Sequence, residues 1–264
     1  MTLIETTSDL KRYIAVGVGL ILAVGRIAHA RADDLTFGGV EASYSHDSNF
    51  LASPANTPAT PESSTTFSGY AGHYWPTADL RSAFILRGEA ALVRQNTYTA
   101  LNSTDVGGSV GYYQAFSPGH VMTLTAGVLA RRFSNQSFDS NTGSLQLALK
   151  QKLSETFWLR EFASVERSEV STTAYGYNGR TLLGSVNWGP NRLTLLSLSA
   201  SLSARTYDGA PGSARVGRQV GATWVQQFND AAYWRAAIAT QTNETLTGVK
   251  YDSTVYSVAL GLSF

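Results

Sequence analysis

The stretch Val255–Phe264 (VYSVALGLSF) decides how the chain folds, because it alternates strictly between two kinds of residue. One set is apolar or aromatic, and the other consists mainly of serine, alanine and glycine. A period of two is that of a β-strand with one oily face. The oily positions are Tyr256, Val258, Leu260, Leu262 and a final aromatic, Phe264.

Eleven other segments alternate in the same way, and residues typical of turns separate them. The connections are of two alternating kinds. Tight turns such as Pro118-Gly119-His120 and Pro190-Asn191-Arg192 alternate with longer polar connections such as 46–64 and 168–177. The expected strands are 34–45, 65–76, 80–94, 105–117, 121–133, 142–153, 157–167, 178–189, 193–206, 215–228, 232–242 and 253–264.

The last strand resembles the C-terminal strand of bacterial outer-membrane β-barrels, in which a final aromatic follows apolar residues at every second position. The resemblance implies a porin-like barrel in an outer membrane. It also implies that Tyr256, Val258, Leu260, Leu262 and Phe264 form the signal that the barrel assembly machinery recognises. The strand is then expected to pair with residues 35–44 and close the sheet.

The beginning of the chain has the features of an export signal. Lys11 and Arg12 precede an apolar run, 13–25, that is too short to span a bilayer. Ala28-His29-Ala30 places small residues at the spacing of a cleavage site. We expect a signal peptide at 1–30, cleaved after Ala30, and a barrel domain at 31–264. An uncleaved anchor is the alternative.

Composition narrows the class of protein. Residues 1–30 hold three of the 20 basic and two of the 19 acidic side chains, so the remainder carries 17 of each and is formally neutral. Neutrality gives no indication of a nucleic-acid partner. The chain has no cysteine, which excludes disulfides and thiolate metal sites.

A barrel follows from the way a backbone must satisfy its polar groups in lipid. After the signal, no run of about 18 apolar residues offers a membrane helix. A chain that enters lipid without such a helix has to close a sheet, because every N–H and C=O needs a partner there. The expected fold is an all-β, transmembrane, antiparallel up-and-down β-barrel of about 12 strands, with 10 or 14 as alternatives, and its short turns face the periplasm.

Aromatic residues gather near the ends of the expected strands. Trp75, Trp158, Trp188 and Trp234 each lie within a few residues of a short turn. Indole rings favour the membrane interface, so these four are expected to form a periplasmic girdle. Aromatics that merely flank turns are the alternative. The outer girdle is expected to comprise Tyr44, Phe133, Tyr177, Tyr207 and Tyr251.

Charged residues in phase with the polar face are the candidates for the lumen. The basic candidates outnumber the acidic ones, which favours anionic solutes. Charges that pair across the interior and plug it are the alternative. In the seventh strand Arg160 is an alternative to Glu161. The candidate lumen residues are Glu41, Arg87, Glu89, Arg131, Lys150, Lys152, Glu161 and Arg235.

The first long connection contains Asp47-Ser48-Asn49, which resembles the start of barrels associated with polysaccharide export and surface-lipoprotein delivery. The same residues are good turn formers, with cation binding as an alternative. His46 is the one histidine expected on the outer side, where outer-membrane hydrolases place a histidine with serine and a carboxylate. Its serine and aspartate partners here are sequence neighbours, which seldom make a catalytic constellation.

The sequence therefore predicts a channel for small polar, anionic solutes, with no catalytic residue, cofactor or metal. A surface-exposed adhesion or export-associated barrel with an occluded lumen is one alternative, and an outer-membrane hydrolase is another. The expected partners are outer-membrane lipids and lipopolysaccharide, the barrel assembly machinery and a small polar solute.

Overall fold

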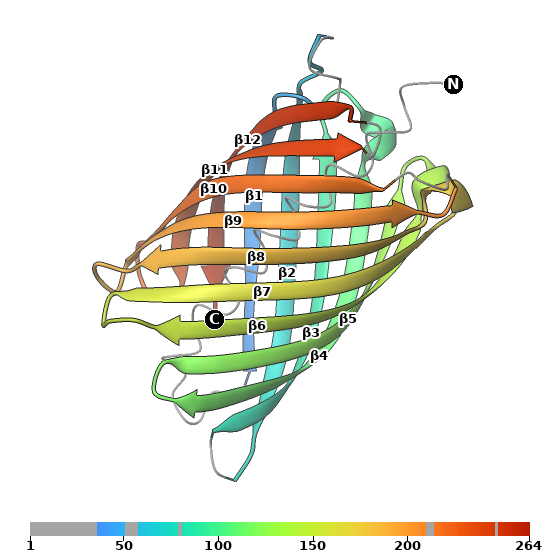
Figure 1. The fold of residues 1–264 in the computed structure, drawn as a ribbon. Coiled ribbons are helices and arrows are strands. Elements are labelled where there is room, and N and C mark those ends of the chain that lie inside the picture. The colour runs from blue at the N-terminus through green and yellow to red at the C-terminus, as the bar shows by residue number, and fades with distance from the viewer. Residues whose placement is uncertain (1–35, 51–57, 79–80, 210–213, 246–247) are drawn as a thin grey trace.

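The structure is a computed structural model that describes residues 36–50, 58–78, 81–209, 214–245 and 248–264. Within them, twelve antiparallel strands form a closed barrel in which each strand pairs with its neighbours in the chain and β1 pairs with β12 (Figure 1). The predicted signal peptide lies outside the described residues. The strands are β1 Thr36–Asp47, β2 Glu62–Pro76, β3 Ser82–Gln95, β4 Ser103–Ser117, β5 His120–Phe133, β6 Ser140–Lys152, β7 Phe157–Val170, β8 Tyr177–Trp188, β9 Thr194–Tyr207, β10 Arg215–Gln227, β11 Ala232–Thr245 and β12 Lys250–Ser263.

The predicted all-β barrel and its twelve strands are confirmed. Several strands extend further than expected on the side of the long connections: β2 begins at Glu62 rather than 65, and β12 begins at Lys250 rather than 253. Polar residues form these extensions, so hydrophobic alternation did not reveal them. Among the described residues, no helix is long and apolar enough to cross a membrane.

Alternation gives the barrel an outer and an inner wall. Directly paired residues share a wall, and the large apolar side chains that remain exposed fall in one phase on every strand. Leu147 of β6, for example, lies in one row with Ala163, Leu182 and Leu202 of the next three strands. An exposed apolar outer wall and a polar inner wall are the arrangement of a barrel in lipid.

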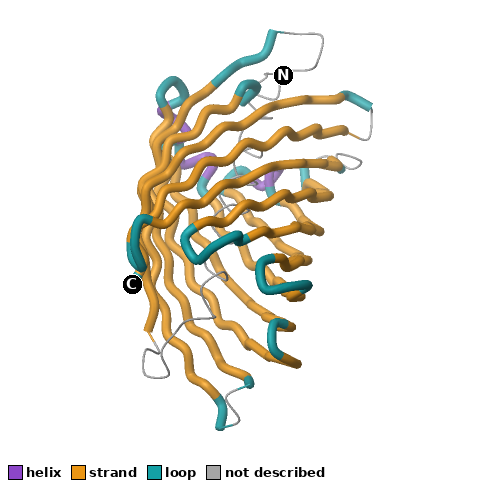
Figure 2. Tube along the Cα trace, turned by 90° about the vertical axis from the view of Figure 1, so that its left-hand side faces the viewer, coloured by secondary structure: helices purple, strands orange, loops and turns teal. Residues whose placement is uncertain are grey.

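The connections define two ends of the barrel. At the turn end, short segments join β2 to β3, β4 to β5, β6 to β7, β8 to β9 and β10 to β11. At the loop end lie the longer connections, three of which contain a 3₁₀ turn (Figure 2). These turns are Thr99–Leu101, Gln136–Phe138 and Thr173–Tyr175.

The described loop-end connections pack against one another. Phe50, Leu101, Phe133 and Phe138 form a buried apolar cluster, and Tyr98 and Tyr175 pack against it. Backbone hydrogen bonds join adjacent connections, such as the amide of residue 135 to the carbonyl of residue 100 at 3.0 Å. Apolar packing and backbone hydrogen bonds therefore hold these connections in a defined arrangement at the loop end.

A buried carboxylate holds the second long connection in place. Oε1 of Glu62 accepts hydrogen bonds from the backbone amides of Ser63, Asn96 and Thr97 at 2.9–3.1 Å. Oε2 accepts from the amides of Thr97 and Tyr98 at 3.2 and 3.1 Å. Amide donors of this kind satisfy a charge that would be costly to bury alone.

The last and first strands close the barrel. Val255–Ser263 of β12 pair with Gly39–Asp47 of β1, and the backbone of Phe264 exchanges hydrogen bonds of 2.8 and 3.0 Å with Gly38. The predicted partner strand is thus correct, displaced by a few residues. Tyr256, Val258, Leu260, Leu262 and Phe264 all point outward.

Candidate functional site

The inner wall carries charged side chains in two layers. The prediction placed eight charged residues there, and the registers place seven of them on that wall. The loop-end layer includes Arg131, and the turn-end layer contains the other six. These six are Glu41, Arg87, Glu89, Lys150, Lys152 and Arg235.

The prediction for Glu161 is wrong. Glu161 pairs with Leu149 of β6 and Gly184 of β8, and therefore points outward. Its carboxylate accepts hydrogen bonds of 3.0 and 3.1 Å from the amide of Gln151, also on the outer wall. Arg160, the alternative, faces inward beside Lys150. Polar and apolar residues occupy both faces of this part of β7, so its sequence does not fix the phase.

The loop-end layer contains two ion pairs, together with Asp47, Glu62 and Arg215. Arg131 contacts Asp105 on the neighbouring strand through Nε at 2.8 Å and Nη2 at 2.5 Å. Arg205 contacts Glu166 at 3.0 Å, two strands away. Gly179 lies between them, and a Cβ there would come within 2.7 Å of the Glu166 side chain. Glycine therefore provides the space through which this ion pair forms.

Two further ion pairs lie in the turn-end layer. Arg87 contacts Glu89 of the same strand at 2.9 Å and stacks over the ring of Tyr70 at 4.7 Å. Arg235 contacts Glu41 at 2.6 Å. Each carboxylate in these pairs offsets one cation, so neither pair gives the lumen a net charge.

Lys150 and Arg160 bring two basic side chains together in the turn-end layer. They are direct cross-strand partners on the inner wall, and Lys152 is the next inward residue on β6. Lys150 stacks over the ring of Trp158 at 5.2 Å, and no carboxylate contacts its ammonium group within the described part of the chain. Lys152 contacts Glu155 at 2.8 Å, but Glu155 is 91% exposed, and such a pair is weak. The three residues form a basic cluster on one side of the lumen.

Between the two layers the inner wall is lined mainly by small side chains. Small side chains leave space inside a barrel of twelve strands, which is wider than the eight-stranded barrels that side chains fill. The larger residues in this zone include Leu129, Phe162, Leu183, Gln146 and Gln219. The small ones include Ser43, Ser68, Ser109, Thr125, Ser199 and Ala239.

The tryptophans divide between the two walls. Trp75, Trp188 and Trp234 point outward near the turn end, where Trp224 joins them with its ring 4.8 Å from that of Trp234. Trp158 is the exception. It lies between Lys152 and the buried Asn187 on the inner wall, so the prediction of a girdle role for Trp158 is wrong.

The expected outer girdle is largely absent from the outer wall. Tyr44 points outward, but the other four aromatics point inward. Tyr177, for example, is almost fully buried under Arg205, whose guanidinium lies 4.1 Å from the ring. The expectation for Phe133, Tyr177, Tyr207 and Tyr251 is therefore wrong.

Each described histidine contacts a hydroxyl group. Nδ1 of His46 lies 3.0 Å from Oγ of Ser63, on the outer wall near the loop end. His73 contacts Thr36 and His120 contacts Ser117 in the same way near the turn end. Asp47 accepts a hydrogen bond from the amide of Asn49 at 2.9 Å, which is the geometry of a turn. Among the described residues, no three His, Asp or Glu side chains gather to hold a metal.

The candidate lumen residues omitted six charged residues of the inner wall: Asp47, Glu62, Asp105, Glu166, Arg205 and Arg215. For Arg205 the signal was present, because Leu202 and Ala204 share the oily face and place residue 205 on the other. Asp105 was detectable in the same way from Val106 and Val110.

Comparison with known proteins places the fold among outer-membrane β-barrels. No family model and no curated protein matches the chain. Among solved structures, an outer membrane channel from Pseudomonas putida F1 is similar with a TM-score of 0.63 and 11% identity, over 89% of this chain and 100% of that one. The β domain of the Bordetella autotransporter BrkA gives 0.51 and 11%, over 88% and 100%. A KdgM porin in complex with disordered oligogalacturonate gives 0.50 and 10%, over 86% and 99%.

Proposed function

We propose that the protein is an outer-membrane channel for small polar, anionic solutes. The observation that carries this proposal is the basic cluster of Lys150, Lys152 and Arg160 on the inner wall. Four other inner-wall cations form ion pairs with carboxylates, and Asp47, Glu62 and Arg215 lie at the loop end, so this cluster concentrates positive charge in the turn-end half of the lumen. A fixed positive charge beside a water-filled path favours anions.

The similar structures support a channel without identifying its solute. One is described as an outer membrane channel, and another is a porin in complex with oligogalacturonate, a polyanion. The third is the β domain of an autotransporter, so the fold alone leaves the task open. The inner-wall charges favour the channel.

The same proposal gives the protein its place in the cell. The loop end faces the exterior and the short turns face the periplasm, as in other outer-membrane barrels. Residues 1–30 act as a cleaved signal peptide, and the outward residues of β12 that end in Phe264 are read by the assembly machinery. Outer-membrane lipids and lipopolysaccharide surround the barrel.

Single-channel recording of the purified protein in planar bilayers tests the channel. Discrete current steps in potassium chloride, and their reduction by an added small organic anion such as citrate, would support it. Absence of current from protein that migrates as a folded, heat-modifiable barrel would contradict it. Specific surface binding without current would instead select the adhesion or export alternative.

An outer-membrane hydrolase is a second candidate, because Ser63 converges on His46 from the neighbouring strand. The hydroxyl of Tyr44 donates to Oγ of Ser63 at 2.9 Å, which leaves the Ser63 proton for Nδ1 of His46. In the described part of the chain, no carboxylate contacts the His46 ring to complete a triad. Ester hydrolysis by phospholipid-loaded protein that disappears in Ser63→Ala would establish this activity.

A further inference from the structure

Five arginines point outward from the loop half of the barrel. They stand on β3, β5, β7, β8 and β10, each in phase with the exposed apolar residues of its strand. At the turn end, by contrast, the outward residues of these strands include the aromatics Phe157 and Trp188. The five are Arg94, Arg132, Arg167, Arg180 and Arg218.

The registers put these arginines at nearly one height. Through the strand pairing, each arginine is in register with a residue on the strand of the arginine before it. That residue lies two or four positions nearer the turn end than the earlier arginine. From β3 to β10, these displacements relative to the register add up to ten residues over seven strand-to-strand steps. The levels are Arg132 with Leu92, Arg167 with Val128, Arg180 with Val165 and Arg218 with Leu182.

Residues at equal height in a barrel are expected to show a displacement of this size, because the strands are tilted relative to the barrel axis. Strands about 4.8 Å apart that rise about 3.3 Å per residue at a tilt of about 45° slip by roughly 1.5 residues per step. The strand ends slip in the same direction: Ser82, which begins β3, pairs with Gln114, three residues before β4 ends at Ser117. The five arginines therefore form a belt.

The belt lies one membrane thickness from the tryptophans. Along β7, ten residues separate Arg167 from Phe157, which stacks on Trp188. At the same rise and tilt, this is a height of about 23 Å, close to the roughly 25 Å apolar band of outer-membrane barrels. The belt thus coincides with the outer interface, where lipid headgroups lie.

Two of the five arginines are available for a ligand. Arg94 and Arg132 donate to backbone carbonyls, and Arg167 forms a two-bond ion pair with Asp208 at 2.7 and 2.8 Å. Arg180 and Arg218 make no hydrogen bond or ion pair within the described residues. They stand on β8 and β10 with small Ala204 on the strand between, and their backbones are on the order of 12 Å apart.

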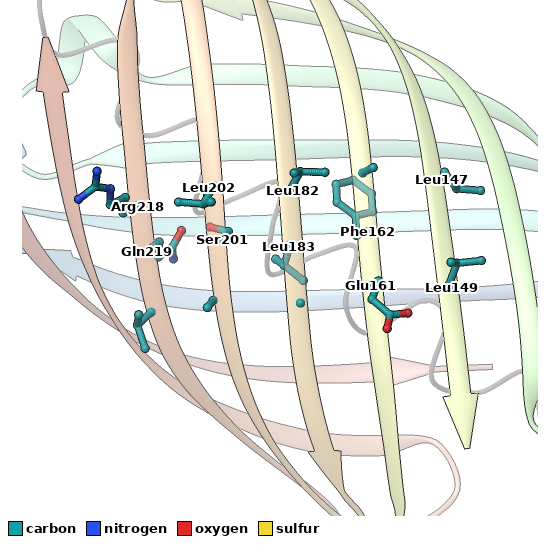
Figure 3. A pocket seen from close by; sticks show the side chains of 14 residues that line it. Leu147, Leu149, Glu161, Phe162, Leu182, Leu183, Ser201, Leu202, Arg218 and Gln219 are labelled. Atoms are coloured by element: carbon teal, nitrogen blue, oxygen red, sulfur yellow. The ribbon is translucent and has the colours of Figure 1, made fainter. Parts of the chain in front are cut away.

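A groove of about 550 Å³ on the outer wall has Arg218 and, nearer the turn end, Glu161 in its otherwise mainly apolar lining (Figure 3). Arg180 stands two residues along β8 from Leu182, which also lines it. Arg218 stands in one row with Leu202, Leu182 and Leu147, which border it. Small residues hollow the wall there, because a Cβ added to Gly184 would meet nothing within 4 Å. The other small residues of the groove are Ala163 and Ala200.

We propose that Arg180, Arg218 and this groove bind a phosphorylated glycolipid of the outer leaflet, of the lipid A type. The guanidinium groups bind its phosphate, and the groove receives an acyl chain. Guanidinium recognises phosphate by charge-assisted, often bidentate, hydrogen bonds. A mainly apolar groove on the lipid side, in which the carboxylate of Glu161 is hydrogen-bonded to Gln151, fits an acyl chain rather than a free phosphate ion. The inference rests on the proposed outer-membrane location and is independent of solute passage.

Native mass spectrometry of the detergent-solubilised protein tests this site. The probes are bisphosphorylated lipid A and the same lipid after enzymatic dephosphorylation. We expect the phosphorylated probe to bind at least about tenfold more tightly to the wild type. The double variant Arg180→Gln/Arg218→Gln should lose that preference, and Gly184→Leu should weaken both probes by filling the groove.

Two controls make the outcome specific. The pair Lys250→Gln/Arg192→Gln removes the same charge away from the groove and should bind like the wild type. Heat-modifiable migration shows that the double variant is folded. If the glutamine pair fails to fold, Arg180→Lys/Arg218→Lys should retain the phosphate preference. Equal binding of the two probes by the wild type, or full binding by a folded double variant, would overturn the proposal.

Discussion

The hydroxyl of Tyr233 donates a 3.0 Å hydrogen bond to Glu41 across the seam where the barrel closes. Tyr233 lies on β11 and Glu41 on β1, so the bond crosses the whole of β12. The ring passes over Gly261, where a Cβ would lie 2.3 Å from the ring. Arg235 contacts the same carboxylate at 2.6 Å. A glycine in the last strand therefore allows a polar clamp over the seam.

Gly261→Ala should destabilise the barrel, because the new methyl group displaces the Tyr233 ring and breaks its bond to Glu41. Overpacking of this kind costs about 1–3 kcal/mol. Urea unfolding in detergent, followed by the loss of heat-modifiable migration, measures the change. Gly143→Ala is the control, since a Cβ at Gly143 meets nothing within 4 Å. Equal midpoints for the two variants would show that the clamp is unimportant.

Glu62→Gln should loosen the second long connection, because a neutral amide accepts the backbone hydrogen bonds of residues 96–98 more weakly than a carboxylate. Hydrogen bonds to a charged acceptor contribute about 1.5–3 kcal/mol each to stability. We expect faster proteolysis within 96–102 while the barrel remains folded. The exposed Glu155→Gln should have no such effect, and unchanged cleavage in Glu62→Gln would contradict the assigned role.

The hydrogen bonds from Arg167 lower the pKa of Asp208, which lies just beyond β9. A carboxyl group with a lowered pKa stabilises the folded state above its ordinary pKa, and this contribution disappears as the pH falls through the lowered value. The thermal midpoint of Asp208→Asn should thus lie below that of the wild type at pH 7 and converge with it under strongly acidic conditions. A difference between the two proteins that is independent of pH would contradict this account.

Trp158 should be shielded from lipid, whereas the tryptophans of the outer wall should contact it. Brominated lipids quench indole fluorescence on contact. In single-tryptophan variants reconstituted into such bilayers, we expect strong quenching for Trp75 and Trp188 and little for Trp158. Acrylamide supplied in the aqueous phase provides the converse measurement. Equal quenching of all three by lipid would contradict the inward position of Trp158.

The architecture was readable from the sequence because lipid imposes one physical demand on every strand. Each strand must present an apolar face, so alternation located all twelve, and the oily positions from Tyr256 to Phe264 identified the closing one. Turn chemistry separated the short connections from the long ones in the same way.

The inner wall was less predictable, because its ion pairs and hydrogen bonds join residues on different strands. Glu161 and Arg160 are adjacent, and only the pairing of β7 with β6 shows which one faces the lumen. Trp158 has the same inward phase as Arg160, although its position near a short turn is typical of a girdle residue. The span from Glu41 to Tyr233 covers most of the chain, and no local pattern indicates that they meet.

The reversal potential across a planar bilayer with a tenfold gradient of potassium chloride tests the central claim most directly. The basic cluster predicts a wild-type channel that favours chloride. Lys150→Glu should shift the reversal potential toward that of potassium, because it places a carboxylate beside Arg160 in the lumen. Lys250→Glu, outside the lumen, should leave it unchanged. A wild-type channel that favours potassium, or a Lys150→Glu channel with wild-type selectivity, would contradict the account.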